Sequence, residues 1–293
     1  MENNIFSEQT DGKSRKKRGG LLAALAVVLV LMLAAGGFYY YAKSACEKAL
    51  VQADALEFTG AAETFRAIPL GGKLFPIESE YIAAGELTAA GDYDAAIEAF
   101  KSLGIYREAP AALKQTRYLQ AGQVLESGAY LDAAALYEAL GNYMDAPDKA
   151  IEARLMRADA LAGGGNFEDA KKLLGELIDE GCEQAEEALV AVYKRCAADY
   201  ADKEQYIKAC SELLELEDRE GVDVELQIAR YRKKAYNSAI SDYRAGDYAA
   251  ATALMEALGD YEEAETYLFL AKVHTKTAWI TADALSTVQK LSV

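Results

Sequence analysis

The sequence predicts an all-α protein: an α-solenoid of about six helix-turn-helix repeats preceded by one transmembrane helix. The composition is the first observation behind this prediction, because the 293-residue chain contains only four Pro and many acidic residues, a balance that favours helices. The second is an uninterrupted apolar stretch over residues 21–41. The third is a pattern of aromatic and small residues that recurs about every 37 residues through the remaining chain.

Residues 1–20 form a polar tail that precedes the apolar stretch. Residues 21–41 carry no charge and end in three consecutive Tyr. A helix of this length extends about 31 Å, which matches a hydrocarbon core of about 30 Å. Aromatic side chains at its end would lie at the headgroup boundary. We therefore predict a transmembrane helix over residues 21–41. The tail has three acidic residues and five basic ones, Lys13, Arg15, Lys16, Lys17 and Arg18.

A cleaved signal peptide is the alternative interpretation of this region. Such a peptide has a shorter apolar run and a cleavage site of small residues, whereas this run ends in bulky Tyr. A lipoprotein signal is excluded because Lys43 stands three residues before Cys46, where an apolar residue is needed. The basic tail predicts a cytoplasmic N-terminus. Residues 42–293, with 26 basic and 44 acidic residues and a net charge of −18, would then lie on the extracytoplasmic side of a bacterial-type cell membrane.

The chain from Ala42 onward repeats a pattern built around one aromatic residue in each unit. Ala lies three positions after every anchor, and large apolar residues lie seven and ten positions after it, all on one face of a helix. Another Ala nine positions before each anchor marks a second helix. Each unit is therefore predicted to be a helical hairpin whose small residues let the two backbones approach closely. The anchors, which recur at a period typical of helical solenoids, are Phe58, Tyr93, Tyr130, Phe167, Tyr206 and Tyr248.

Turns separate the predicted helices. Four units have Gly two residues before the anchor, where a positive φ would end the first helix, and the fifth unit has Glu204 there. Three units continue into Leu-Gly-x-Tyr-x-x-Ala, at 103–109, 140–146 and 258–264. Residues 265–293 are expected to form a helix that closes the array. Because neither Pro nor Gly separates Tyr41 from Ala55, we expect the membrane helix to continue into the first repeat helix, with a kink only at Gly36-Gly37.

This pattern resembles the tetratricopeptide repeat (TPR) family. The small residue before the anchor, the anchor itself and the residues three and seven positions after it match that family's signature, as does Gly-Asp-Tyr at 91–93 and 246–248. The resemblance implies a right-handed α-solenoid with a concave binding surface. The family's Pro after the second helix is missing from its usual place. Its first-helix aromatics, Tyr81, Tyr118 and Tyr236, stand one residue from the family's position, so they either pack in the core or face the groove.

Motifs for enzymatic chemistry are hard to find. The Gly163–Asn166 run precedes no Lys-Ser/Thr and reads as a turn. His274 is the single His, which excludes triads and zinc sites built on several His. Cys182, Cys196 and Cys210 are widely spaced, unlike the close pairs of zinc knuckles, and the last two are either buried thiols or a disulfide. We expect no catalytic residue, metal or cofactor, and the net charge of −16 disfavours nucleic acid.

We therefore expect a membrane-anchored protein–protein interaction or scaffold module, with no enzymatic activity. The alternative is a cell-envelope glycan-binding protein that uses groove aromatics. The acidic repeat domain favours a protein or peptide partner with a basic face, although the charge would also keep a solenoid soluble. The candidate partner-binding residues are Tyr81, Tyr118, Glu126, Asp159, Asp202 and Tyr236.

Overall fold

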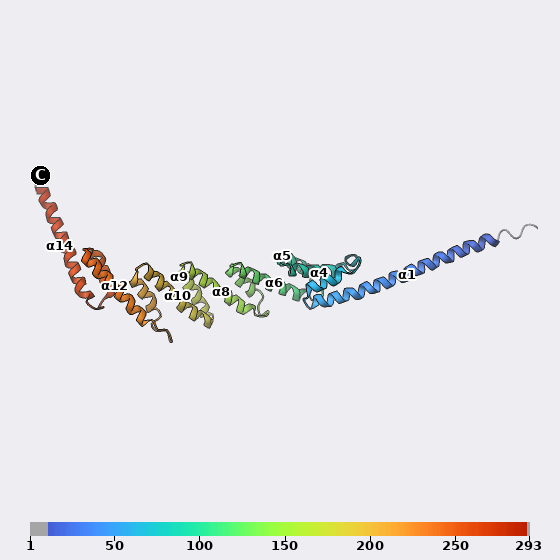
Figure 1. Ribbon diagram of the computed structural model, residues 1–293, viewed down its shortest axis with the longest axis horizontal. Coiled ribbons are helices and arrows are strands. Elements are labelled where there is room, and N and C mark those ends of the chain that lie inside the picture. Colours follow the sequence, from blue (N-terminus) through green and yellow to red (C-terminus); the bar gives the residue numbers. More distant parts are fainter. Residues whose placement is uncertain (1–10, 292–293) are drawn as a thin grey trace, which may run out of the picture. The chain divides into compact units, whose positions relative to one another are not determined.

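The computed structural model describes the backbone of residues 11–291 and the side chains of residues 21–277. Every regular element in the described backbone is a helix (Figure 1). Residues 1–10 of the tail therefore lie outside the described residues, as do the side chains of residues 11–20, which include the five basic ones, and those of the last part of the closing helix. The helices are α1 (Asp11–Asp54), α2 (Phe58–Arg66), α3 (Gly71–Leu74), α4 (Pro76–Ala89), α5 (Tyr93–Leu103), α6 (Ala109–Glu126), α7 (Tyr130–Glu138), α8 (Ala146–Gly163), α9 (Phe167–Asp179), α10 (Glu183–Asp202), α11 (Tyr206–Leu214), α12 (Glu225–Ala245), α13 (Tyr248–Leu258) and α14 (Ala264–Leu291).

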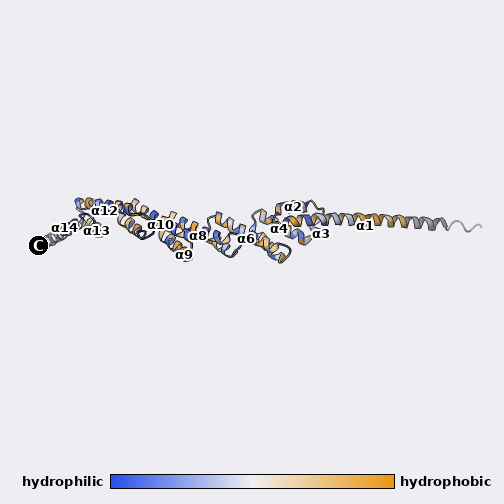
Figure 2. Cartoon of the chain, turned by 90° about the horizontal axis from the view of Figure 1, so that it is seen from below, coloured by the Kyte–Doolittle hydropathy of each residue, from blue (hydrophilic) through white to orange (hydrophobic). Residues whose placement is uncertain are grey.

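Helix α1 changes character along its length. All side chains from residue 21 to residue 41 are exposed, and most are apolar (Figure 2). By length and composition α1 is the one helix of the described chain suited to crossing a membrane. From Ala42 onward one face of the same helix is buried, at Ala42, Cys46, Ala49, Leu50 and Ala53. The predicted continuation into the first repeat helix is confirmed, and the helix runs through Gly36-Gly37 without interruption.

The aromatic anchors and the small residues of the predicted register occupy equivalent places in the helices. Each of the six aromatic anchors is the first residue of a helix: α2, α5, α7, α9, α11 and α13. The Ala three positions later is fully buried in every unit, because it faces the neighbouring helix where a larger side chain would hold the backbones apart. The Ala nine positions before each anchor is at most 1% exposed. These twelve residues are Ala49, Ala61, Ala84, Ala96, Ala121, Ala133, Ala158, Ala170, Ala197, Ala209, Ala239 and Ala251.

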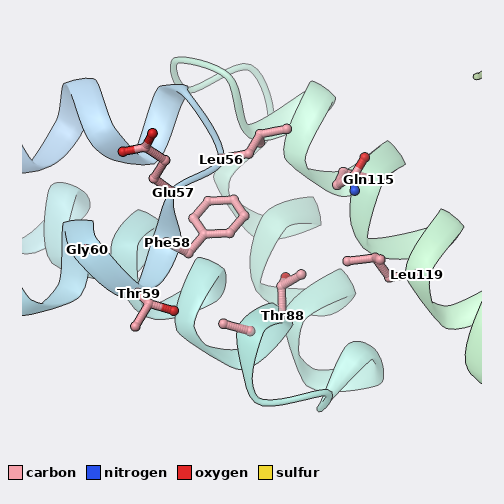
Figure 3. A pocket seen from close by; sticks show the side chains of 9 residues that line it. Leu56, Glu57, Phe58, Thr59, Gly60, Thr88, Gln115 and Leu119 are labelled. Carbon is pink, nitrogen blue, oxygen red and sulfur yellow. The ribbon is translucent and has the colours of Figure 1, made fainter.

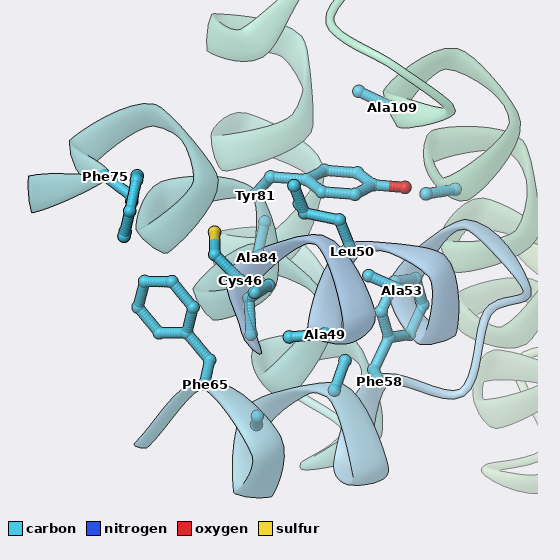
Figure 4. Close-up of a cluster of buried hydrophobic side chains, with 14 of the residues drawn as sticks. Cys46, Ala49, Leu50, Ala53, Phe58, Phe65, Phe75, Tyr81, Ala84 and Ala109 are labelled. Carbon is cyan, nitrogen blue, oxygen red and sulfur yellow. The ribbon is translucent and has the colours of Figure 1, made fainter. Parts of the chain in front are cut away.

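The chain divides into two compact units, one made of residues 1–128 and 136–146 and the other of residues 129–135 and 147–293. In the first unit α2 and α4 pack on α1, α5 packs on α4, and α6 packs on α5. Its core gathers large aromatic side chains around the C-terminal part of α1 (Figure 4). In the second unit each helix from α9 to α14 packs on the next one. Helices that are neighbours in sequence are thus neighbours in space within each unit.

The turn before each anchor has the same backbone conformation in all six units. The four predicted Gly positions have φ between +80° and +85°. The two units without Gly adopt this conformation as well, with Leu56 at φ +63° and Glu204 at φ +59°. An L-residue with a side chain pays about 1–2 kcal/mol for this region. The tertiary arrangement of the helix pair therefore imposes the turn even where the local sequence opposes it.

Replacing Glu204 by Gly is expected to stabilise the second unit by about 0.5–1 kcal/mol. The substitution removes the steric cost of the left-handed backbone, and the greater freedom of Gly in the unfolded chain offsets part of this gain. Thermal unfolding of the two proteins measures the difference. As the matched control, Gly165→Ala at the same turn position, with φ +80°, should lower stability. A lower melting temperature for Glu204→Gly would contradict the expectation.

The Leu-Gly-x-Tyr-x-x-Ala motif forms a specific connection between successive hairpins. Its Gly has φ of +58°, +57° or +61°, and the residue three positions later also has a positive φ of +45° to +51°. Its final Ala is fully buried and begins the next long helix, α6, α8 or α14. The motif thus turns the chain twice and starts the next helix, with Pro as the second residue of α6 (Pro110) and α8 (Pro147). The residues with unfavourable positive φ are Arg107, Met144 and Glu262.

Candidate functional site

The three ambiguous tyrosines each pack against the Tyr of the connecting motif in the same repeat. All three pairs meet edge to face, with interplanar angles of 65° to 73°, a geometry favoured by the ring quadrupoles. The tyrosine twelve residues before the anchor occurs in the same three units as the connecting motif, and this co-occurrence in the sequence could have indicated the pairing. The ring-centroid distances are 5.7 Å for Tyr81–Tyr106, 6.0 Å for Tyr118–Tyr143 and 5.9 Å for Tyr236–Tyr261.

Tyr81 lies in the core, so its candidacy as a partner-binding residue is corrected. Its side chain is 0% exposed, and its hydroxyl donates a hydrogen bond of 3.3 Å to Oδ1 of Asp54 at the end of α1. Burial, and then the nearby Asp54 carboxylate, raise the pKa of Tyr81, which keeps the phenol protonated. Arg107 donates from Nε to both Asp54 oxygens at 3.1 Å. The buried hydroxyl is therefore satisfied within the protein.

Tyr118 and Tyr236 are half-buried, so each keeps part of its ring at the surface. The Tyr118 hydroxyl donates a hydrogen bond of 2.5 Å to Oδ1 of Asp145, and the Tyr118 ring centre lies 5.5 Å from that of Tyr137. Burial is the main cause that raises the pKa of Tyr236. Both rings are held by intramolecular contacts, and only their outer parts are available to a ligand.

The three candidate acids are all exposed. Glu126 is the last residue of α6 and Asp202 is the last residue of α10. A carboxylate is disfavoured there because the C-terminal end of a helix carries partial negative charge. Asp159, four residues before the end of α8, accepts a hydrogen bond of 3.1 Å from Arg195. Glu126 belongs to the first unit, and the two Asp belong to the second.

An ion cluster that sequence reasoning missed links α9 to α11 in the second unit. Lys171 Nζ lies 2.5 Å from a Glu168 oxygen and 3.1 Å from a Glu212 oxygen, and its side chain is 13% exposed. The ammonium also lies 4.9 Å from the ring centre of Tyr193. The pairing with Glu168 belongs to one helix turn and was readable from the sequence. The pairing with Glu212, which is distant in sequence, depends on the packing of the two helices.

The four cysteines are free and buried, which confirms the thiol alternative for Cys196 and Cys210. Burial raises the pKa of the Cys46 thiol to about 11, and burial with the nearby Glu212 carboxylate does the same for Cys196. These thiols are therefore protonated and unreactive at neutral pH. Among the described side chains, no group of three or more His, Cys, Asp or Glu is placed to hold a metal ion.

A cleft of about 400 Å³ opens in the first unit where the turn between α1 and α2 faces α4 and α6 (Figure 3). Phe58, Leu56 and Leu119 give it apolar walls, and Gln115 and Glu57 add polar groups at its rim. Thr88, which also lines the cleft, is buried. Its hydroxyl lies 2.9 Å from that of Thr116, which is buried as well. The cleft thus offers an apolar surface with few polar contacts.

These features define an all-α protein of paired helices in which one helix is apolar and long enough to cross a membrane. No family model, no curated protein and no solved structure matches this chain.

Proposed function

We propose that the protein is a membrane-anchored interaction or scaffold module that presents a TPR-like solenoid on the extracytoplasmic side of the cell membrane. The observation that carries this proposal is that the side chains of α1 change from exposed and apolar to buried in a core along the length of the helix. Residues 21–41 expose apolar side chains on all faces, an arrangement that is favourable in lipid and costly in water. Residues 42–53 of the same helix form part of the first unit's core. One rigid element would therefore connect the membrane to the repeats.

The helical pairs support an interaction role. Repeats that each contact only their neighbours build long exposed surfaces, and such surfaces suit extended protein or peptide ligands. The sequential packing of α9 to α14 and the twelve buried Ala at equivalent positions support a TPR-like arrangement. The basic residues of the tail favour a cytoplasmic N-terminus and thus an extracytoplasmic repeat domain.

Charge supports a partner with a basic face. Residues outside the tail carry a net charge of −18, which attracts cationic surfaces over distances of a Debye length. Glu126 and Asp202 are exposed at helix ends where a carboxylate costs about 0.3–1 kcal/mol. Helix stability does not account for these acids, which supports a role for them in recognition of a basic partner.

Photo-crosslinking in native membranes tests the proposal. A photoreactive residue at Glu126 or Asp202, followed by mass spectrometry, is expected to capture the same protein partner from both positions. The control position is Lys101, an exposed residue of α5 that lies outside the candidate set. Equal capture of unrelated proteins at all three positions would contradict a specific interaction surface.

Once the partner is identified, its association rate should fall steeply with salt. The Debye length decreases from about 10 Å at 0.1 M to about 3 Å at 1 M, which removes electrostatic steering. Combining Glu126→Gln, Asp159→Asn and Asp202→Asn is expected to slow association at low salt and to flatten the salt dependence. Stopped-flow kinetics across this range measures both effects.

The matched control removes the same amount of charge from other positions. Glu98→Gln, Glu152→Gln and Glu256→Gln each neutralise an exposed acid that pairs with a nearby Lys. This variant should keep most of the low-salt rate. If both triple variants behave alike, total charge and not the candidate acids governs association.

The glycan-binding alternative is distinguished by co-sedimentation of the full chain with envelope polysaccharide. Binding that Tyr118→Ala abolishes while the helical content is retained would favour a glycan ligand. Tyr118→Phe separates ring from hydroxyl, since it keeps the ring packing and removes the hydrogen bond to Asp145.

A further inference from the structure

The loop between α2 and α4 contacts the aromatic end of the apolar part of α1. We use the term loop for residues 68–77, which comprise most of this connection, with the short helix α3, and the first two residues of α4, Pro76 and Ile77. Its Phe75 is 8% exposed, and the Phe75 ring centre lies 6.1 Å from that of Tyr39. Tyr39 belongs to the run of aromatic residues that ends the stretch 21–41. Along the axis of α1, the loop is therefore level with the predicted headgroup boundary.

The loop exposes apolar side chains at this level. Leu70 is 62% exposed and Ile77 is 51% exposed. On α1, Phe38 is 38% exposed and Tyr39, whose ring contacts Phe75 of the loop, is 50% exposed. Two chain segments that meet at one level thus both present apolar and aromatic surface, which is the composition of interfacial membrane-binding segments.

Within these two segments the charged residues are basic, in contrast to the acidic remainder of the repeats. Lys43 is the single charged residue of the segment 38–46, and Lys73 is the single charged residue of the loop. Both are exposed. The first acids beyond the two segments are Glu47 and Glu78. An ammonium group beside apolar side chains matches lipid phosphate lying above acyl chains.

We propose that the loop 68–77 is a second membrane contact, which lies at the boundary between headgroups and acyl chains beside the point where α1 leaves the bilayer. Leu70 and Ile77 enter the apolar side of this boundary, and Lys73 and Lys43 face phosphate. The inference rests on the proposed role of α1 as a membrane span. Together, the span and the loop fix the tilt of the first unit against the membrane, which a single helix leaves free.

The same unit provides an exposed apolar residue that should remain in water. Ile105 is 94% exposed in the connection between α5 and α6. Arg107, which follows closely in the chain, binds Asp54 at the far end of α1. From Tyr39 to Asp54 the helix axis rises by about 22 Å, at about 1.5 Å per residue, which is well beyond the headgroups when the axis is near the membrane normal.

The test places an environment-sensitive fluorophore on single introduced cysteines in the full chain, reconstituted in vesicles of phosphatidylcholine and phosphatidylglycerol. The variants are Leu70→Cys, Ile77→Cys, Ile105→Cys and, inside the apolar stretch, Val30→Cys. The native thiols are buried, and labelling of the unsubstituted protein measures their background. Quenching by nitroxide attached to the upper acyl chain reports proximity to the boundary, and quenching by nitroxide attached near the end of the acyl chain reports proximity to the bilayer centre.

Labels at Leu70 and Ile77 are expected to be quenched roughly twofold or more above the label at Ile105. Equal quenching at these three positions by the upper nitroxide, with strong quenching at Val30 by the deep nitroxide, would overturn the loop contact and leave the span intact. Weak quenching at Val30 by both nitroxides would overturn the span, and the loop inference with it. The two failures are therefore distinguishable.

Discussion

Replacing Gly85 by Ala is expected to destabilise the first unit by about 2–3 kcal/mol, although Ala is the better helix former. Gly85 lies within α4, and a Cβ added there would stand 2.0 Å from Cδ1 of Phe58 and within 2.7 Å of two other ring atoms. Phe58 is 5% exposed and is enclosed by the core of α1, α2 and α4, so its ring cannot move aside without displacing other side chains. Chemical denaturation measured by circular dichroism gives the change in unfolding free energy.

Gly122 provides a matched control for this substitution. It lies eight residues before its anchor, as Gly85 does, but in the next repeat, within α6. A Cβ there would meet only the hydroxyl oxygen of Tyr137, at 3.4 Å. Gly122→Ala should therefore be neutral or stabilise by up to about 1 kcal/mol, through helix propensity. Equal losses for the two substitutions would show that the Phe58 contact is not the cause.

Replacing Ala96 by Leu is expected to cost about 1–3 kcal/mol, because the extra methylene groups must enter a packed interface. Ala96 is 0% exposed and shares one core cluster with Ala84 of the facing helix, which is 1% exposed. A Leu side chain at this point would force α4 and α5 apart. Thermal unfolding of the full chain measures the loss.

The neighbouring residue supplies the control for this interface. Ala95 is exposed, so Ala95→Leu adds the same atoms to the same helix on its solvent side and should change stability by less than about 0.5 kcal/mol. In the third repeat, Ala133→Leu and Asp132→Leu form an equivalent pair, since Ala133 is buried and Asp132 is exposed. Equal melting temperatures within either pair would refute the register.

The continuity of α1 has a consequence for the proposed function. A flexible linker would let a repeat domain rotate freely above the membrane, but no non-helical residue separates Tyr41 from the first core residues of the same helix. Force or reorientation at the membrane would therefore reach the first unit directly. The contact between Tyr39 and Phe75 adds a second connection at the same level.

The sequence by itself determined the helical class, the start of each second helix and the buried small residues. This was possible because the period of an α-helix fixes which residues share a face, so the spacing between Phe58 and Ala61 already requires that both face the same neighbour. The apolar length of residues 21–41 and the absence of a breaker after Tyr41 likewise determined the long α1.

Only the tertiary structure decided what lies opposite each face. The burial of Tyr81 depends on Asp54 and Tyr106, which reach it from other parts of the chain, and no local pattern distinguishes this position from an exposed groove. The same holds for the contact of Lys171 with Glu212. It also holds for the left-handed backbone at Glu204, which the packing of α10 on α11 imposes against local preference. Helix periodicity is a property of the chain's own geometry, whereas a partner across an interface is set by the packing of residues distant in sequence.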